Sequence, residues 1–242
     1  MPNGGVKIVE SATERKAGAK DPASRVSAVF DWVELFTVSL AIVLLLMCFV
    51  VRHSPVIGAS MEPTVNGSES AVVGGKTIQS QSDIMLISRM FYTPKTGDVI
   101  VINSPHNFKE PIIKRVIAVG GQTVKLDFDN WETYVDGKKL EEPYFEGTRA
   151  LQRFNAEKGA FEWVQTNPNL EDRSRGYSME DYGLDSDGDG FYEVTVPEGQ
   201  IFVMGDHRNN SKDSRILGCI DERYILGKVL LRIYPFNRFG TL

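Results

Sequence analysis

The sequence predicts a mainly β protein in which an antiparallel β-sheet domain follows one N-terminal transmembrane helix. Two observations support this fold class. A single uninterrupted apolar run, Trp32–Val51, lies near the N-terminus of the 242-residue chain. Beyond it, short β-type runs alternate with turn residues, and no long amphipathic helix is evident. Hydrophobic residues make up 42% of the chain and charged residues 24%, which is ordinary for a protein that folds largely in water.

The apolar run predicts an uncleaved membrane anchor over residues 32–52. Its twenty residues carry one charge, Glu34, in the first turn, and a helix of that length spans about 30 Å, the thickness of a bilayer core. A buried helix of a soluble domain would show a polar face, which this run lacks. A cleaved signal peptide would have an apolar core of about 7–15 residues and an A-x-A site close behind it, and neither is found.

Basic residues flanking the run predict its orientation. The preceding tail carries five Lys and Arg, whereas beyond the run Arg52 is followed by no Lys or Arg until Lys76. The positive-inside bias therefore favours a cytoplasmic N-terminus at the plasma membrane, with residues 53–242 outside. Residues 1–31 show no apolar periodicity, so we expect a disordered cytoplasmic tail.

The extracytoplasmic part should consist of short strands joined by turns. The Asp136-Gly137 pair is a good two-residue hairpin turn between two β-type runs. The strands we expect cover residues 84–87, 98–103, 112–119, 123–128, 133–135, 192–196, 200–204 and 228–234.

Charge and cysteine content exclude several classes of function. The net charge is −5, so there is no general basic surface to bind nucleic acid. Residues 127–198 hold 18 acidic and 7 basic side chains, which indicates an acidic insert at about 141–193. The two cysteines, Cys48 and Cys219, provide neither a disulfide framework nor a thiolate metal site. Function must therefore rest on oxygen and nitrogen chemistry.

One segment of the insert resembles half of a calcium loop. Asp185, Asp187, Asp189 and Gly190 have the Asp-x-Asp-x-Asp-Gly spacing, but the twelfth position, which needs a bidentate Glu, is Val196. We interpret the segment as an acidic turn, with a weak structural Ca²⁺ site as the alternative. No cofactor is expected to be required.

Ser60 is the first candidate for a nucleophile. It lies in the segment Gly58–Thr64, just after the apolar run, between small residues and a proline. Serine is a poor nucleophile unless a base takes its proton. Of the three histidines, His53 and His106 are better explained as exposed polar residues, and His207 is the better candidate for a base.

Lys114 is a second candidate for the base. It lies within the apolar run Ile112–Val119, and burial can lower a lysine pKa from about 10.4 by several units, leaving a neutral amine. On the strand pattern alone, a strand-edge lysine that reaches water beside Arg115 is the simpler interpretation.

A third polar segment, Gly205–Arg215, follows a predicted strand. It could be a solvated loop. Asp, Ser and Arg at such close spacing can also form a buried network that holds a neighbouring base in position.

Taken in order, these three segments resemble bacterial type I signal peptidase. The matching motifs are Ser-Met-x-Pro-Thr after the anchor, Lys-Arg-Val in an apolar strand, and Gly-Asp-x-x-x-x-Ser-x-Asp-Ser-Arg near the C-terminus. The resemblance covers the span and most of 53–242, but not the stretch at about 141–193. One span with the catalytic part outside resembles the Gram-positive form, and the family's antiparallel β fold agrees with the predicted strands.

The resemblance implies a role for each matching residue. Ser60 corresponds to the nucleophile, Lys114 to the general base, and Ser211 to the hydroxyl that orients the lysine amine. The supporting residues are a structural ion pair and two further loop positions, namely Asp213 with Arg215, and Asp206 with Ser214.

This chain departs from the family pattern at two positions. The Asn usual after Gly-Asp is His207, which leaves a histidine contribution open. Some relatives have a serine at the position of Gly58, so the donor to the oxyanion should here be backbone, most simply the Ser60 amide.

The function we expect is a membrane-anchored serine endopeptidase that removes signal peptides from exported preproteins after A-x-A-like sites. Ser60 follows Arg52 by eight residues, at most about 28 Å of extended chain, which keeps it near the bilayer. The partners would be preprotein signal peptides and the lipid bilayer. The substrate would bind as an added strand, and the residues expected to line its pockets are Ile57, Gly58, Met61 and Ile113.

Two alternatives remain at this point. One is a catalytically inactive single-span surface module that uses a calcium-binding insert, and the other is a Ser/Lys protease dedicated to itself or to one partner. The intact Ser60 and Lys114 argue against the inactive form.

Overall fold

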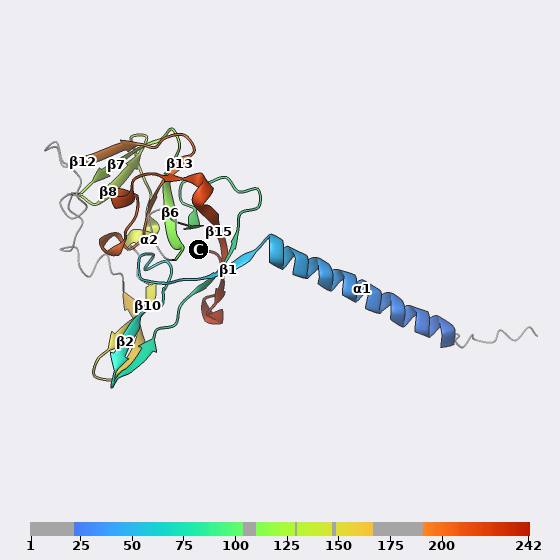
Figure 1. Ribbon diagram of the computed structural model, residues 1–242. Coiled ribbons are helices and arrows are strands. Elements are labelled where there is room, and N and C mark those ends of the chain that lie inside the picture. The colour runs from blue at the N-terminus through green and yellow to red at the C-terminus, as the bar shows by residue number, and fades with distance from the viewer. Residues whose placement is uncertain (1–21, 104–109, 129, 147–148, 167–190) are drawn as a thin grey trace, which may run out of the picture. The chain divides into compact units, whose positions relative to one another are not determined.

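The computed structural model describes residues 22–103, 110–128, 130–146, 149–166 and 191–242 (Figure 1). The chain divides into two compact units, residues 1–46 and 47–242. The described part of the first unit is helical, and every strand among the described residues lies in the second.

Helix α1, Pro22–Phe49, contains the apolar run. Its segment Val29–Leu46 is long and apolar enough to cross a membrane, and none of that segment is buried within the protein. Residues 22–31, which we expected to belong to a disordered tail, are helical. Pro22 at the first helical position suits this start, because its missing N–H would have no intrahelical partner there. The expectation was wrong because it relied on apolar periodicity, which the short segment before the span lacks.

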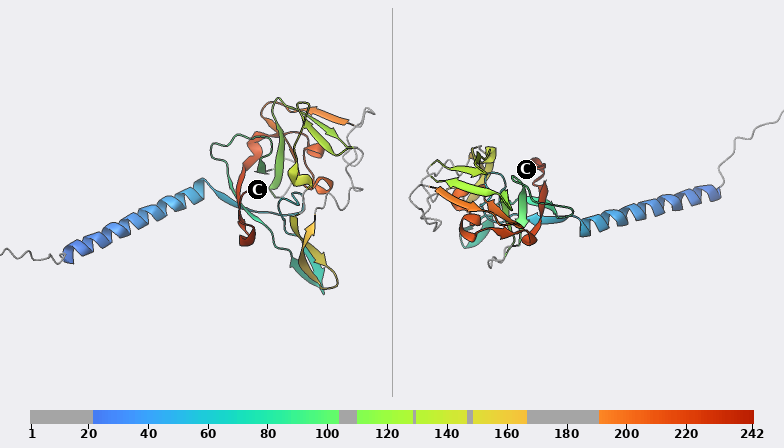
Figure 2. Two further views of the ribbon diagram at one scale, coloured as in Figure 1. Left: turned by 180° about the vertical axis from the view of Figure 1, so that it is seen from behind. Right: turned by 90° about the horizontal axis from the view of Figure 1, so that it is seen from above.

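The main sheet of the second unit is antiparallel, with the strand order β1-β4-β15-β5-β6-β13-β14. Figures 1 and 2 show this β-rich unit from three directions. Strand β6 lies inside the sheet, between β5 and β13, so both of its edges are hydrogen-bonded. All of its residues except the two end ones are buried, so both of its faces are covered as well. The strand bounds are β1 Arg52–Pro55, β4 Ile84–Ser88, β5 Val99–Ile102, β6 Ile112–Val119, β13 Gln200–Met204, β14 Ile220–Asp221 and β15 Ile225–Tyr234.

A second antiparallel sheet has the order β12-β7-β8-β9. Its strands are β7 Thr123–Asp127, β8 Glu132–Val135, β9 Lys138–Lys139 and β12 Phe191–Thr195. The predicted hairpin turn is confirmed, because Asp136 and Gly137 have φ of 51° and 73°, as a type I′ turn requires.

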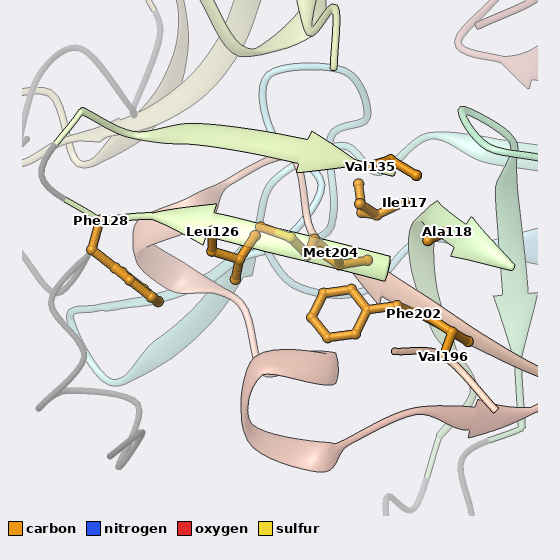
Figure 3. Packing of buried hydrophobic residues seen from close by; sticks show 9 residues of the cluster. Ile117, Ala118, Leu126, Phe128, Val135, Val196, Phe202 and Met204 are labelled. Atoms are coloured by element: carbon orange, nitrogen blue, oxygen red, sulfur yellow. The ribbon is translucent and has the colours of Figure 1, made fainter. Parts of the chain in front are cut away.

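One apolar cluster joins the two sheets (Figure 3). It brings Ile117 and Ala118 of β6 and Phe202 and Met204 of β13 against Leu126 of β7. All five are fully buried. Because β6 and β13 are packed on this cluster, the segments attached to them are held on a rigid base.

Two further hairpins were not expected from the sequence. One is β2 Ser70–Val73 with β3 Lys76–Gln79, and the other is β10 Arg149–Asn155 with β11 Ala160–Thr166. They lie close together, since a Cβ placed on Gly159, in the turn between β10 and β11, would be 3.2 Å from Cγ1 of Val73 in β2. The β10–β11 hairpin belongs to the acidic insert.

The remaining described elements are short helices. These are α2 Pro143–Glu146, η1 Arg208–Asn210, α4 Ser214–Leu217, η2 Glu222–Tyr224 and η3 Phe236–Arg238. A mainly β, antiparallel fold with one N-terminal apolar helix is therefore confirmed. The segment Asp185–Gly190 lies outside the described residues, so the calcium loop stays a prediction.

Candidate active site

The amine of Lys114 lies against the hydroxyl of Ser60. Lys114 Nζ is 2.6 Å from Ser60 Oγ and donates to the Ile113 carbonyl at 3.0 Å. Only 2% of Lys114 is exposed, whereas Ser60 is half-buried and so remains open on one side. The structure thus brings together the two residues that the sequence predicted as nucleophile and base.

Burial lowers the pKa of Lys114 to about 8 from its usual 10.5. The neighbouring charge of Arg215 contributes to this lowering, while the charges of Asp213 and Asp206 oppose it. At pH 7 about one tenth of the lysines would then carry a neutral amine. In that form Nζ can accept the proton of Ser60 Oγ, which is the task of a general base.

Strand β6 places Lys114 and its neighbour Arg115 on opposite faces, and both are buried. Arg115 forms a bidentate ion pair with Asp206, with Nε–Oδ1 at 2.9 Å and Nη2–Oδ2 at 2.7 Å. The interpretation of Lys114 as a strand-edge lysine reaching water is therefore wrong. The strand pattern could not reveal this, because the polar partners come from distant segments.

The loop 205–215 is a buried network and not a solvated loop. Asp213 and Arg215 form a fully buried ion pair, with Arg215 Nε 2.8 Å from Asp213 Oδ1. Asp213 also accepts from the Gly205 amide at 2.9 Å, and the hydroxyl of Ser214 accepts from the Val203 amide at 2.9 Å. Burial would raise the pKa of Asp213, but the charge and hydrogen bonds of Arg215 outweigh it and hold that pKa below its usual value.

Gly205 lets this loop approach the serine. A Cβ on Gly205 would lie 2.3 Å from both the Ser60 carbonyl oxygen and the Ser211 hydroxyl, so no larger residue fits without displacement. Ser211 is buried and helps to lower the pKa of Asp213. Within the described residues its hydroxyl nevertheless makes no hydrogen bond of standard geometry, to Lys114 or to any other group.

His207 contacts the backbone of the serine segment. Its amide donates to the Ser60 carbonyl at 3.1 Å, and its Nδ1 lies 3.1 Å from the Ala59 carbonyl. Because a carbonyl can only accept, Nδ1 carries the proton in this contact. Burial lowers the pKa of His207 to about 4, so the ring is neutral at pH 7. His207 therefore holds the backbone around Ser60.

Residues 59–66, which we call the nucleophile turn, are held at several further points that the sequence did not reveal. Thr64 Oγ1 donates to Asp206 at 2.5 Å, and the Thr64 carbonyl accepts from Arg232 at 2.6 Å. The Asn66 amide donates to Asp83 at 3.0 Å. The buried Glu62 pairs with Arg153 of β10. An acidic residue two positions after the serine was the one local signal for these contacts.

The four expected pocket residues divide into two groups. Ile57 is 62% exposed and forms a parallel bridge with Ser68, and Gly58 is half-buried beside it. Met61 and Ile113 are buried in an apolar cluster beneath the turn. Their roles in substrate binding stay predictions.

The chain is similar to signal peptidases over most of its length. The family model described as "Signal peptidase, peptidase S26" matches residues 29–234. The "Probable signal peptidase I-1" of Synechocystis sp. is 31% identical over 217 residues, covering 87% of this chain and 85% of that protein.

Two further relatives give the same result. The "Signal peptidase I" of Bacillus amyloliquefaciens is 31% identical over 219 residues, 90% of this chain and 95% of that protein. The "Signal peptidase IB" of Staphylococcus aureus is 30% identical over 214 residues, 87% of this chain and 92% of that protein. The family match includes the apolar helix, the nucleophile turn, β6 and the loop 205–215. The chain therefore belongs to the signal peptidase family, peptidase S26, a family of serine peptidases.

Proposed function

We propose that Ser60 and Lys114 form the catalytic dyad with which this membrane-anchored peptidase cleaves signal peptides from preproteins after A-x-A-like sites. Family membership supplies the reaction, and the proposal adds the residues, the cleavage-site specificity and the topology. The 2.6 Å distance between a buried lysine amine and a half-buried serine hydroxyl supports it most directly.

In the proposed mechanism the neutral Lys114 amine takes the proton of Ser60 as Oγ attacks the scissile carbonyl. The tetrahedral intermediate collapses to an acyl-enzyme, and the Lys114 ammonium returns the proton to the departing amine. Water then attacks the ester with Lys114 again as base, the bond between the acyl carbon and Ser60 Oγ breaks, and the Lys114 ammonium returns its proton to Oγ as the new C-terminal product leaves. Every proton moves between groups of the chain, substrate and water, so no cofactor is needed.

Two neighbouring groups complete the proposed site. The Ser60 amide makes no hydrogen bond within the described part of the chain, which supports it as the donor to the developing oxyanion. The buried hydroxyl of Ser211 lies against Gly205, next to the backbone of Ser60. It is suited to accept a hydrogen bond from Lys114 and to orient its lone pair. Asp206, Asp213, Ser214 and Arg215 then act as supporting residues.

The proposed topology places α1 in the plasma membrane with a cytoplasmic N-terminus and residues 53–242 outside. The apolar helix supports the anchor, and the basic residues before it support the direction. Ile57 and Gly58, accessible beside the nucleophile turn, are proposed to contact the substrate strand, with Met61 and Ile113 shaping its pockets from beneath.

Cleavage of a defined substrate tests the proposal. The full chain in detergent is incubated with a synthetic peptide that contains one A-x-A site, and the products are mapped by mass spectrometry. We expect one cut, directly after the second alanine, and no cut by Ser60→Ala. Replacement of both alanines by leucine should abolish cleavage. Cleavage elsewhere in the peptide, or equal cleavage of the leucine peptide, would contradict the proposed specificity.

A further inference from the structure

The β10–β11 hairpin of the acidic insert reaches the nucleophile turn through an ion pair. Arg153 Nη2 is 2.9 Å from Glu62 Oε2, and Nη1 is 3.3 Å from Oε1. Glu62 is 2% exposed and lies two residues after Ser60. A bidentate guanidinium fixes the orientation of a carboxylate as well as its charge. The position of Glu62 in the turn is thus coupled to the hairpin.

The burial of Glu62 makes this coupling strong. A buried carboxylate that loses a cationic partner is left with less compensation for its charge, which favours movement toward water or uptake of a proton. Each of these responses disturbs the backbone that carries Ser60. The proton-transfer distance of 2.6 Å between Ser60 and Lys114 is set by the same backbone.

His207, in the loop 205–215, contacts the same turn. It binds the carbonyls of Ala59 and Ser60, before and at the nucleophile, whereas Arg153 binds Glu62 behind it. The charge of Arg153 also acts on the His207 ring, where it contributes to the lowered pKa. The contacts made by His207 and by Arg153 therefore lie close together, on either side of the serine.

The hairpin has anchors of its own, so it can serve as a rigid support. Leu151 of β10 is fully buried. On β11, the Trp163 ring lies 5.8 Å from the guanidinium of Arg238. Arg238 pairs in turn with Asp83 at 3.4 Å, and Asp83 accepts from the Asn66 amide at the end of the nucleophile turn.

The start of the insert contacts the opposite part of the site. Glu142, one residue before α2, forms an ion pair with the fully buried Arg208. Arg208 Nε donates to the Gly205 carbonyl at 3.0 Å, and Gly205 is the residue that packs against Ser60 and Ser211. Two ion pairs thus connect the insert to the two segments that meet at the nucleophile.

We infer that Arg153 is a positioning residue for catalysis: acting through Glu62, it lets the inserted hairpin hold the nucleophile turn at the distance that proton transfer to Lys114 requires. The insert is then part of the catalytic apparatus. This inference rests on the proposed role of Ser60 as the nucleophile.

The test compares kcat and KM of full-length variants on the A-x-A peptide. Arg153→Met should lower kcat about 10–100-fold, because small displacements of reacting groups cost that much, while KM stays within about twofold. Arg153→Lys should recover part of the loss, since it keeps a charge near Glu62. The matched control is Lys158→Met, which removes an exposed ion pair with Glu162 on the same hairpin and should leave kcat unchanged.

A double-mutant cycle with Glu62→Gln separates positioning from general damage to the fold. If Arg153 acts through Glu62, the double variant should be scarcely slower than the slower single variant, because each change breaks the same link. Multiplicative losses, or Arg153→Met with wild-type kcat, would overturn the inference. If Arg153→Met does not fold by circular dichroism, Arg153→Lys and Glu62→Gln supply the same cycle.

Ser60→Ala distinguishes this inference from the proposed function. An inactive Ser60→Ala together with a wild-type kcat for Arg153→Met would refute the positioning role alone. An active Ser60→Ala would refute the dyad itself.

Discussion

Lys114 Nζ and Ser60 Oγ lie 2.6 Å apart although 54 residues separate them in the chain. Strand β6 carries the lysine through the interior of the main sheet, and the nucleophile turn delivers the serine to its amine. Under the proposed function this pair takes the place of a histidine base, since no histidine contacts the serine hydroxyl within the described part of the chain. The predictions below follow from the burial and contacts of this pair.

Activity should rise with pH through about 8. The pKa of Lys114 is lowered to about 8, and only the neutral amine can accept the Ser60 proton. Initial rates with the A-x-A peptide between pH 6 and 10 should therefore fit one ionisation near 8 on the acidic limb. A rate independent of pH over this range would contradict a lysine base.

Lys114→Met should stabilise the fold while it abolishes activity. The folded-state pKa of about 8 lies below the usual 10.5, a difference equivalent to about 3 kcal/mol. Because the unfolded state holds its proton more tightly, the cost is present in full below pH 8 and disappears as the pH rises toward 10.5. We expect a higher Tm than wild type at pH 6 and a smaller gain at pH 10. An unchanged or lower Tm at pH 6 would argue against the buried amine.

Gly205→Ala should lower both stability and activity. The new Cβ would lie 2.3 Å from the oxygens of Ser60 and Ser211, and such overpacking typically costs about 1–3 kcal/mol. Gly137→Ala is a suitable control, because its Cβ would meet nothing within 4 Å and only the φ of 73° is strained. Thermal unfolding should show the loss of stability of Gly205→Ala, and kcat/KM should show a loss of activity for Gly205→Ala but not for Gly137→Ala. Full activity of that variant would mean that the loop can retreat from the serine.

His207→Asn should keep activity within about tenfold of wild type, since removing a general base typically costs 10²–10⁴-fold. The ring of His207 binds the Ala59 carbonyl and is neutral at pH 7, and an Asn side chain can also donate to that carbonyl. Kinetics on the A-x-A peptide decide the matter. If His207→Asn lost as much activity as Lys114→Ala, the result would indicate that His207 acts as the general base.

Millimolar Ca²⁺ tests the acidic segment Asp185–Gly190, which lies outside the described residues. If its three aspartates bind the ion, Ca²⁺ should raise the Tm more than Mg²⁺ does, because a flexible oxygen-rich loop suits the larger ion. Asp187→Asn should weaken this effect. Equal responses to the two ions, or none, would identify the segment as an acidic turn.

The sequence predicted the elements of the site better than their contacts. Strand β6 has the same bounds as the expected strand because its residues are apolar except for Lys114 and Arg115. The ion pair of Arg115 with Asp206 spans 91 residues, and no local pattern encodes such a distance. That contact depends on how the sheet brings β6 and the loop 205–215 together.

The β10–β11 hairpin was missed for a different reason. The burial pattern of β11 does not alternate along the strand, so the period of two that predicts a half-buried strand is absent. Arg153, the residue that links this hairpin to the site, lies in the stretch at about 141–193 that the resemblance to type I signal peptidase did not cover. Only the three-dimensional pairing with Glu62 connects it to the site.

The central claim is that Ser60 and Lys114 act as one unit, and a double-mutant cycle on kcat/KM tests it most directly. Ser60→Ala, Lys114→Ala and the double variant are assayed on the A-x-A peptide, with Lys158→Met as the control lysine. Each single change should remove nearly all activity, and the double variant should be scarcely worse than either, because residues that act together do not contribute additively. Substantial activity in Lys114→Ala, or losses that multiply in the double variant, would contradict the dyad.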